Sequence, residues 1–118
     1  MAAVENLMAG GIPASVAKQI GLEAPATGLT ATGTTQATAL ALVSNFAIFS
    51  TVAANSGCLV SGDKDSVIVN GGVNPLTVYP PVGMNFNGGT TNAGFTVTNG
   101  KTGLFLPARN STIAALQG

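Results

Sequence analysis

Residues 66–81 read SVIVNGGVNPLTVYPP, and this stretch decides the fold expected for the chain. Its two ends, residues 66–69 and 76–79, are rich in the β-branched and aromatic side chains typical of strands. The Asn-Gly-Gly sequence at 70–72 favours the positive φ angles of a reversing chain, and Pro75 presets a turn before the second run. The stretch therefore predicts a β-hairpin. Its expected core face consists of Val67, Val69, Leu76 and Val78.

Further strand signals lie on both sides of this stretch. Asn99-Gly100 is a strong signal for a two-residue hairpin turn, with residues 94–98 and 102–106 as its strands. Other expected strands are residues 35–43, 45–52, 58–60 and, more weakly, 110–116. A helix over residues 35–49 is the main alternative, because alanine and leucine favour it. About seven or eight short strands with regular turns predict a mainly β fold, an antiparallel sandwich or barrel. No internal repeat of solenoid length is visible.

The amino-terminal part of the chain has a different pattern. Residues 1–22 predict two short helices, with Val4, Leu7 and Met8 on the first and Val16 and Ile20 on the second. Such short helices need a surface to pack on, which is the β-domain, a sister subunit or another protein. Residues 23–33 (EAPATGLTATG) have the composition of a linker. The expected organisation is a helical arm (1–22), a linker (23–33) and a β-domain (34–118).

The composition excludes several classes of function. Only 7% of the residues are charged and the net charge is zero, so the chain lacks the basic surplus of a nucleic-acid-binding protein. There is no histidine, which removes the commonest catalytic base and metal ligand. The longest apolar run, residues 37–43, is too short to cross a membrane, and the amino terminus lacks the basic start of a signal peptide. So little charge suits a surface that is largely covered by partners.

The search for chemistry finds no catalytic constellation. Asp63 and Asp65 form the only acidic pair, and two carboxylates in a glycine-led loop are typical of a solvated turn. Cys58 is expected to be a small buried hydrophobic residue. We therefore expect no enzyme, no cofactor and no metal. The candidate functional residues are interface contacts: Val4, Leu7, Met8, Val16, Ile20, Phe46, Phe49, Tyr79 and Phe86. For Tyr79, the simpler interpretation is a rim aromatic whose hydroxyl reaches a backbone group.

Three segments resemble small bacteriophage virion proteins. They are GLTATGTTQATAL from Gly28, NGGVNPLTVYPPVGMNFNG from Asn70, and FTVTNGKTGLFL from Phe95. The resemblance spans roughly residues 28–106, and its motifs are structural ones: strands, Gly/Asn-Pro turns and a Gly-Lys-Thr turn. The proteins that carry such segments are head decoration (cement) proteins or small fibre-like proteins of the virion.

The resemblance implies a function and partners. It implies a decoration protein that binds the major capsid protein on the outer surface of the phage head and stabilises the shell. The resemblance also implies a homo-oligomer, with a trimer as the expected state. The alternative that it leaves open is a head fibre or a tail-associated receptor-binding module. In that case the loops at residues 70–75 and 85–92 would be the exposed tips that touch a host glycan.

Overall fold

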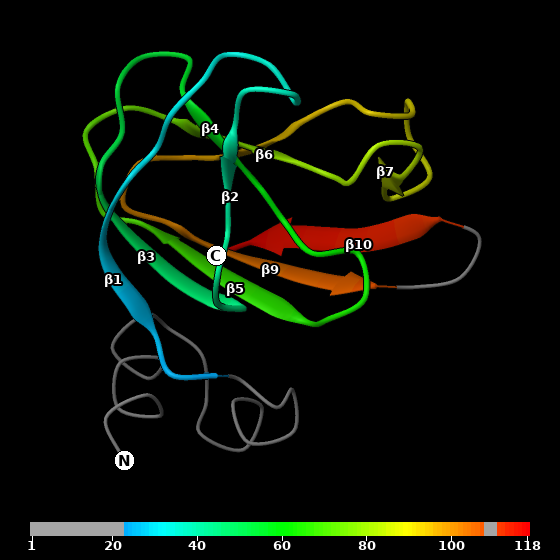
Figure 1. Ribbon diagram of the computed structural model, residues 1–118, viewed down its shortest axis with the longest axis horizontal. Helices are drawn as coiled ribbons and strands as arrows, with labels where there is room; N and C mark the ends of the chain where they lie inside the picture. Colours follow the sequence, from blue (N-terminus) through cyan, green and yellow to red (C-terminus); the bar gives the residue numbers. More distant parts are fainter. Residues whose placement is uncertain (1–22, 108–110) are drawn as a thin grey trace.

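The computed structural model describes residues 23–107 and 111–118, and these form a mainly β structure of two mixed sheets, without a helix in the described part (Figure 1). The predicted helical arm at residues 1–22 lies outside the described residues. The strands are β1 (Ala26–Thr30), β2 (Leu40–Ala41), β3 (Phe46–Thr51), β4 (Gly57–Leu59), β5 (Ser66–Asn70), β6 (Leu76–Tyr79), β7 (Asn85–Phe86), β8 (Phe95–Val97), β9 (Thr102–Pro107) and β10 (Thr112–Gln117).

Successive strands from β1 to β6 alternate between the two sheets. The order in the six-stranded sheet is β1-β3-β5-β9-β10-β7, and in the four-stranded sheet it is β2-β4-β6-β8. β1, β3 and β5 pair in parallel, and so do β2, β4 and β6. The chain therefore makes three turns of a flattened coil, with one strand of each turn in each sheet. The strands of the six-stranded sheet begin at Ala26, Phe46 and Ser66, so each turn advances by 20 residues.

This coil is an internal repeat that the sequence did not reveal. The residues that stack in register share burial rather than identity: Phe46 pairs with Val67, and Ala47 pairs with Ile68. A structural repeat of this kind needs apolar side chains at matching positions, and many residue types satisfy that requirement.

The last part of the chain closes both sheets with antiparallel strands. β8 pairs with β6 in the four-stranded sheet, whereas β9 pairs with β5 and β10 in the six-stranded sheet. β7 adds to the far side of β10 in parallel. The prediction of a mainly β fold is thus confirmed, whereas its antiparallel pairing is wrong, because both sheets are mixed. The described residues form ten strands rather than the seven or eight expected.

The predicted hairpin at residues 66–81 is also wrong, although both of its strands are present. β5 belongs to the six-stranded sheet and β6 to the four-stranded sheet, so the turn between them is an arch from one sheet to the other. The Asn99-Gly100 turn likewise leads from β8 in the four-stranded sheet to β9 in the six-stranded sheet. β5 pairs instead with β3 and β9, and β6 pairs with β4 and β8.

Other predictions differ in extent. Within residues 35–43 only Leu40–Ala41 is a strand, because residues 35–39 form a turn in which the Ala39 N–H donates to the Thr35 carbonyl at 3.0 Å. The predicted linker at 23–33 contains β1. The predicted strands at 45–52 and 110–116 are confirmed as β3 and β10.

The core lies between the two sheets. The buried hydrophobic residues that pack there are Ala31, Ala47, Phe49, Val52, Cys58, Val60, Ile68, Leu76, Val78, Phe86, Val97, Phe105, Ile113 and Ala115. Three phenylalanine rings form its aromatic part: Phe95 meets Phe105 edge-on with 5.6 Å between ring centroids, and Phe86 lies 5.5 Å from Phe105. Of the predicted core face, Leu76 and Val78 are confirmed, whereas Val67 and Val69 are not part of this core.

Candidate interaction surfaces

The six-stranded sheet has a second apolar face, which points away from the core. In β3, Ala47 and Phe49 belong to the core, so the alternation of a strand turns Phe46 and Ile48 to the other side. In β5, Ile68 is in the core and Val67 and Val69 alternate with it. We call this side the outer face, and its residues are Phe46, Ile48, Val67, Val69, Leu104, Leu106, Ala114 and Leu116.

The outer face is continuous across four neighbouring strands. Phe46 pairs with Val67, Val67 pairs with Leu104, and Leu104 pairs with Leu116. Phe46 and Val67 are fully buried, and they are the two buried hydrophobic residues of the described chain that do not pack in the core. The sequence contained a signal for this face, because residues 45–52 carry apolar side chains on both sides of the strand.

The aromatic residues predicted as interface contacts have different positions. Phe49 and Phe86 lie in the core, so they do not present their rings to a partner. Phe46 is buried on the outer face. The remaining predicted contacts are Val4, Leu7, Met8, Val16 and Ile20, and they lie outside the described residues.

Tyr79 covers the outside of the four-stranded sheet. Its hydroxyl donates a hydrogen bond to the Thr34 carbonyl at 3.1 Å, as the rim-aromatic interpretation expects. Its ring lies beside two glycines on the neighbouring segments, since a Cβ added at Gly57 or Gly94 would lie 2.9 Å or 3.3 Å from a ring carbon. Tyr79 is therefore held by contacts within the chain and is only half-buried.

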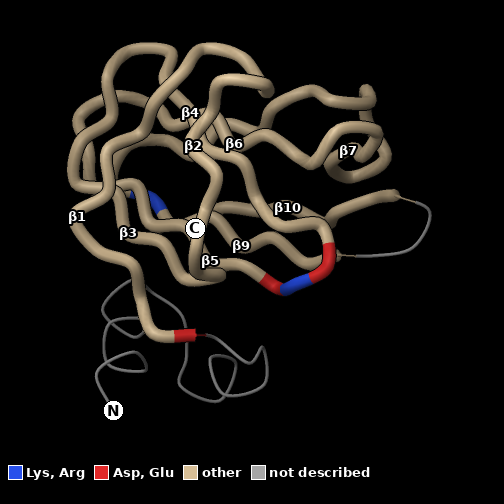
Figure 2. Tube along the Cα trace, viewed as in Figure 1, with Lys and Arg blue, Asp and Glu red and all other residues tan. Residues whose placement is uncertain are grey.

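Charged side chains are sparse and gathered in few places (Figure 2). Asp63, Lys64 and Asp65 form one loop, and Glu23 reaches Lys64 with 3.7 Å between Oε2 and Nζ. The Ser61 hydroxyl hydrogen-bonds to Asp63. That bond lowers the pKa of the Asp63 carboxyl below its ordinary value, and the nearby Lys64 lowers it further. Both side chains of the Glu23–Lys64 pair are about half exposed, so the pair contributes little to stability.

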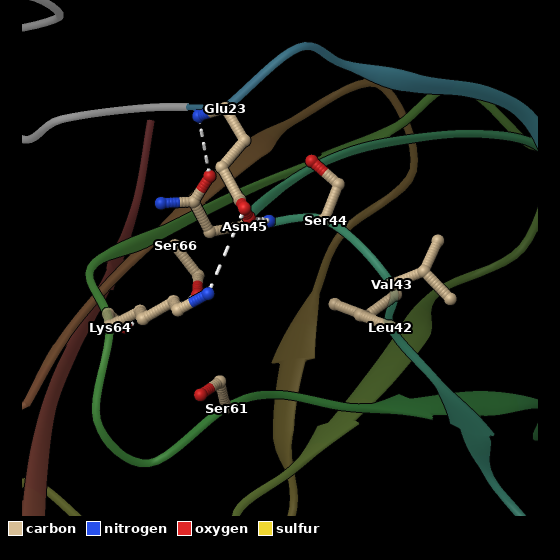
Figure 3. A pocket seen from close by; sticks show the side chains of 8 residues that line it. All are labelled: Glu23, Leu42, Val43, Ser44, Asn45, Ser61, Lys64 and Ser66. Atoms are coloured by element: carbon tan, nitrogen blue, oxygen red, sulfur yellow. Dashed lines mark hydrogen bonds and ion pairs between the residues drawn. The ribbon is translucent and has the colours of Figure 1, made fainter.

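Glu23 also closes a reciprocal pair of hydrogen bonds with Asn45 (Figure 3). The Glu23 N–H donates to Asn45 Oδ1 at 2.7 Å, and the Asn45 N–H donates to Glu23 Oε1 at 3.0 Å. The Ser44 hydroxyl adds a bond to the Ala24 carbonyl at 2.8 Å. These contacts attach the segment that leads into β1 to the start of β3. They leave a shallow pocket of about 120 Å³ between Glu23, Lys64 and residues 42–45.

A second pocket, of about 130 Å³, opens at the first turn of the coil. Its lining is almost wholly apolar and comes from β1, β2, β3 and the segment between β2 and β3, with Leu29, Leu40 and Leu42 as the largest side chains. Both pockets are much smaller than the roughly 300 Å³ or more of typical small-molecule sites. Neither has the size or the converging polar groups of a substrate site.

The inventory of reactive groups among the described residues is short. No three histidine, cysteine or carboxylate side chains of residues 23–107 and 111–118 gather where a metal ion would bind. Cys58 is fully buried, and this burial raises the pKa of its thiol well above the ordinary value, so it stays protonated and unreactive. Within the same residues no helix is long and apolar enough to span a membrane.

Two asparagines of the loops considered as glycan-binding tips bond within the chain. Asn70 donates from Nδ2 to the carbonyls of Asn74 and Val97, each at 2.9 Å. Asn87 bonds to both the N–H and the carbonyl of Ala115, at 2.9 and 3.0 Å. The side-chain amides of Asn70 and Asn87 are thus engaged by the protein backbone.

The described residues therefore offer surfaces for contact: an apolar outer face, a nearly uncharged exterior and two small pockets. Comparisons of the chain with models of protein families, with curated proteins and with solved structures find no match. The function must therefore be inferred from the chain's own residues.

Proposed function

We propose that this protein is a structural protein of a bacteriophage particle, a decoration protein that binds the outer surface of the head and stabilises the shell. Its partner is the major capsid protein, and it acts as a homo-oligomer, in the simplest case a trimer. The observation that carries the proposal is the nearly uncharged exterior of a small β structure. Only Glu23, Asp63, Lys64, Asp65 and Lys101 are charged within the described residues.

Such a surface suits binding by shape and by apolar and backbone contacts. A protein with no net charge has weak self-repulsion, which is a disadvantage for a free monomer but not for a subunit packed on a shell. Several linked contacts of one oligomer strengthen binding by avidity, without the need for a strong individual pair. The resemblance of residues 28–106 to small virion proteins agrees with this role.

Copy number in purified particles tests the proposal. Quantitative mass spectrometry should find on the order of hundreds of copies for each particle, because a closed symmetric shell repeats its binding surface many times. About a dozen copies or fewer would place the protein at a vertex or on the tail, which contradicts decoration and favours a head fibre or receptor-binding module. Absence from the particles would contradict both.

Salt dependence provides an independent check on the mechanism. Because few charges are available, dissociation of the protein from particles should change little between low and high ionic strength. A steep rise of dissociation with salt would show that ion pairs dominate the contact. The major capsid protein in the same sample, still assembled, serves as the control for particle integrity.

A further inference from the structure

The dipeptide Asn-Gly occurs three times in the chain, at residues 70–71, 87–88 and 99–100. Asparagine is thermolabile before glycine, because glycine has no Cβ to block the approach of its own nitrogen to the asparagine side chain. The glycine nitrogen bonds to Cγ of the asparagine, and the side-chain –NH2 leaves as ammonia with the proton of the glycine N–H. Water then opens the succinimide ring that has formed and gives aspartate or isoaspartate. All three sites have the local sequence for this reaction, so the fold decides which of them reacts.

We propose that Asn99 is the site of this deamidation in the folded protein, and that the fold protects Asn70 and Asn87. The only co-reactant is water. The product has a new carboxylate, so a chain of zero net charge becomes negatively charged. The inference rests on three turns and their hydrogen bonds, and it does not depend on the proposed role in a phage head.

Asn70 is the most firmly held of the three asparagines. It is fully buried, its Nδ2 donates to two backbone carbonyls at 2.9 Å each, and its Oδ1 accepts from a backbone N–H at 3.0 Å. The attacking group is held as well, because the Gly71 N–H donates to the Phe49 carbonyl at 2.8 Å. The reaction at Asn70 therefore requires the arch between β5 and β6 to open.

Asn87 is exposed, but its side chain is bonded to β10. Its Oδ1 accepts from the Ala115 N–H at 2.9 Å, and its Nδ2 donates to the Ala115 carbonyl at 3.0 Å. Cγ of Asn87 cannot turn toward the Gly88 nitrogen without the loss of both bonds. The reaction at Asn87 therefore requires the loop after β7 to separate from β10.

Asn99 lies at the exposed turn between β8 and β9, and its side chain has no hydrogen-bond partner within the described residues. Its turn is closed by backbone bonds alone: the Gly100 N–H donates to the Asn70 carbonyl at 2.8 Å, and the Lys101 N–H donates to the Thr98 carbonyl at 3.0 Å. Because both central residues of the turn are exposed, these bonds open by a local fluctuation that leaves the core intact. Asn99 therefore needs the smallest opening of the three sites.

Peptide mapping by mass spectrometry tests this order on the full-length chain. Folded protein and protein in denaturant are kept at the same mildly alkaline pH, and the aspartate and isoaspartate formed at each Asn-Gly are followed with time. For each site, the rate in denaturant divided by the rate in the folded chain measures the protection by the fold. This protection should be about a hundredfold greater at Asn70 than at Asn99, the factor that corresponds to three hydrogen bonds of ordinary net strength.

Two results of this experiment would overturn the proposal. Equal protection at the three sites would mean that each reacts only after the whole molecule unfolds. Faster formation of aspartate at Asn70 or Asn87 than at Asn99 in the folded chain would assign the reactive site elsewhere.

Charge variants provide a second readout. Isoelectric focusing of aged, folded protein should show one main acidic species, and Asn99→Ala should not form it on the same timescale. Asn55→Gly is the matched control, because Asn55 is another exposed turn asparagine and its positive φ of 63° suits glycine. This control should form the acidic species at the unaltered rate. Circular dichroism checks that both variants remain folded. An undiminished acidic species in Asn99→Ala would overturn the assignment.

Discussion

At the scale of single residues, asparagine side chains form hydrogen bonds with backbone N–H and C=O groups. Asn70 is fully buried, accepts a bond from the Gly72 N–H at 3.0 Å, and donates to Asn74 and Val97. Asn74 in turn donates to the Val52 carbonyl at 2.9 Å. These bonds join the arch between β5 and β6 to Val52, directly after β3, and to Val97 of β8, which explains why asparagine is needed at positions 70 and 74.

Asn70→Ala should therefore be strongly destabilising. It removes three hydrogen bonds and leaves the buried Val97 carbonyl without this donor, so the free energy of unfolding should fall by about 3 kcal/mol. Chemical denaturation followed by circular dichroism measures the change. Asn99→Ala, at the exposed Asn99-Gly100 turn, is the matched control and should shift the midpoint little. Equal effects of the two substitutions would contradict the role given to Asn70.

At the scale of elements, the four-stranded sheet depends on close contact between β6 and the segment that enters β8. A Cβ added at Gly94 would lie 2.5 Å from Thr77 Cγ2, which is far inside normal contact. Thr77 lies in β6 and pairs with Thr96 of β8. Glycine at position 94 therefore lets the chain pass close over β6, beside the ring of Tyr79.

Gly94→Ala should lower the free energy of unfolding by about 2 kcal/mol through this overlap. Thr77→Ser removes the methyl group that the new Cβ would meet, so the double variant should recover part of the loss, with a coupling of about 1 kcal/mol. A double-mutant cycle of urea unfolding measures this coupling. Additive effects would show that the Thr77 methyl is not the obstacle.

At the scale of the whole molecule, the scarcity of titratable groups predicts a flat dependence of stability on pH around neutrality. There is no histidine to titrate between about pH 5 and 8. The pKa of Asp63 is lowered in the folded chain, so its contribution is present above the ordinary aspartate pKa and is lost as the pH falls through its folded value. Acid destabilisation should therefore begin only below about pH 4.

At alkaline pH, Cys58 should dominate the pH dependence of the unfolding free energy. Burial raises the pKa of its thiol, so the folded chain keeps the proton while the unfolded chain loses it above about pH 8.5. The unfolding free energy should then fall by about 1 kcal/mol over the first pH unit above that value, and the slope approaches about 1.4 kcal/mol per unit at higher pH. Denaturation between about pH 8.5 and 9.5 measures this fall. Cys58→Ala should remove it, and an unchanged slope in that variant would contradict the assignment.

The sequence by itself determined the mainly β character and the positions of most strands. Residues 66–70, 76–79 and 102–107 have the β-branched and apolar composition of strands, and local preference is sufficient to locate such segments. It also determined the low charge and the lack of histidine, which bound the possible chemistry. For Tyr79, the expectation of a hydroxyl bonded to backbone is confirmed by its contact with Thr34.

Only the tertiary structure decided which strands pair and which faces meet. The Asn70–Gly72 and Asn99–Gly100 sequences reverse the chain, but whether the return strand joins the same sheet depends on partners far away in the sequence. Val67 and Ile68 are equally apolar, and pairing alone turns one to the outer face and the other to the core. Local sequence sets the tendency of each segment to be a strand, whereas the pairing is selected by packing across the whole molecule.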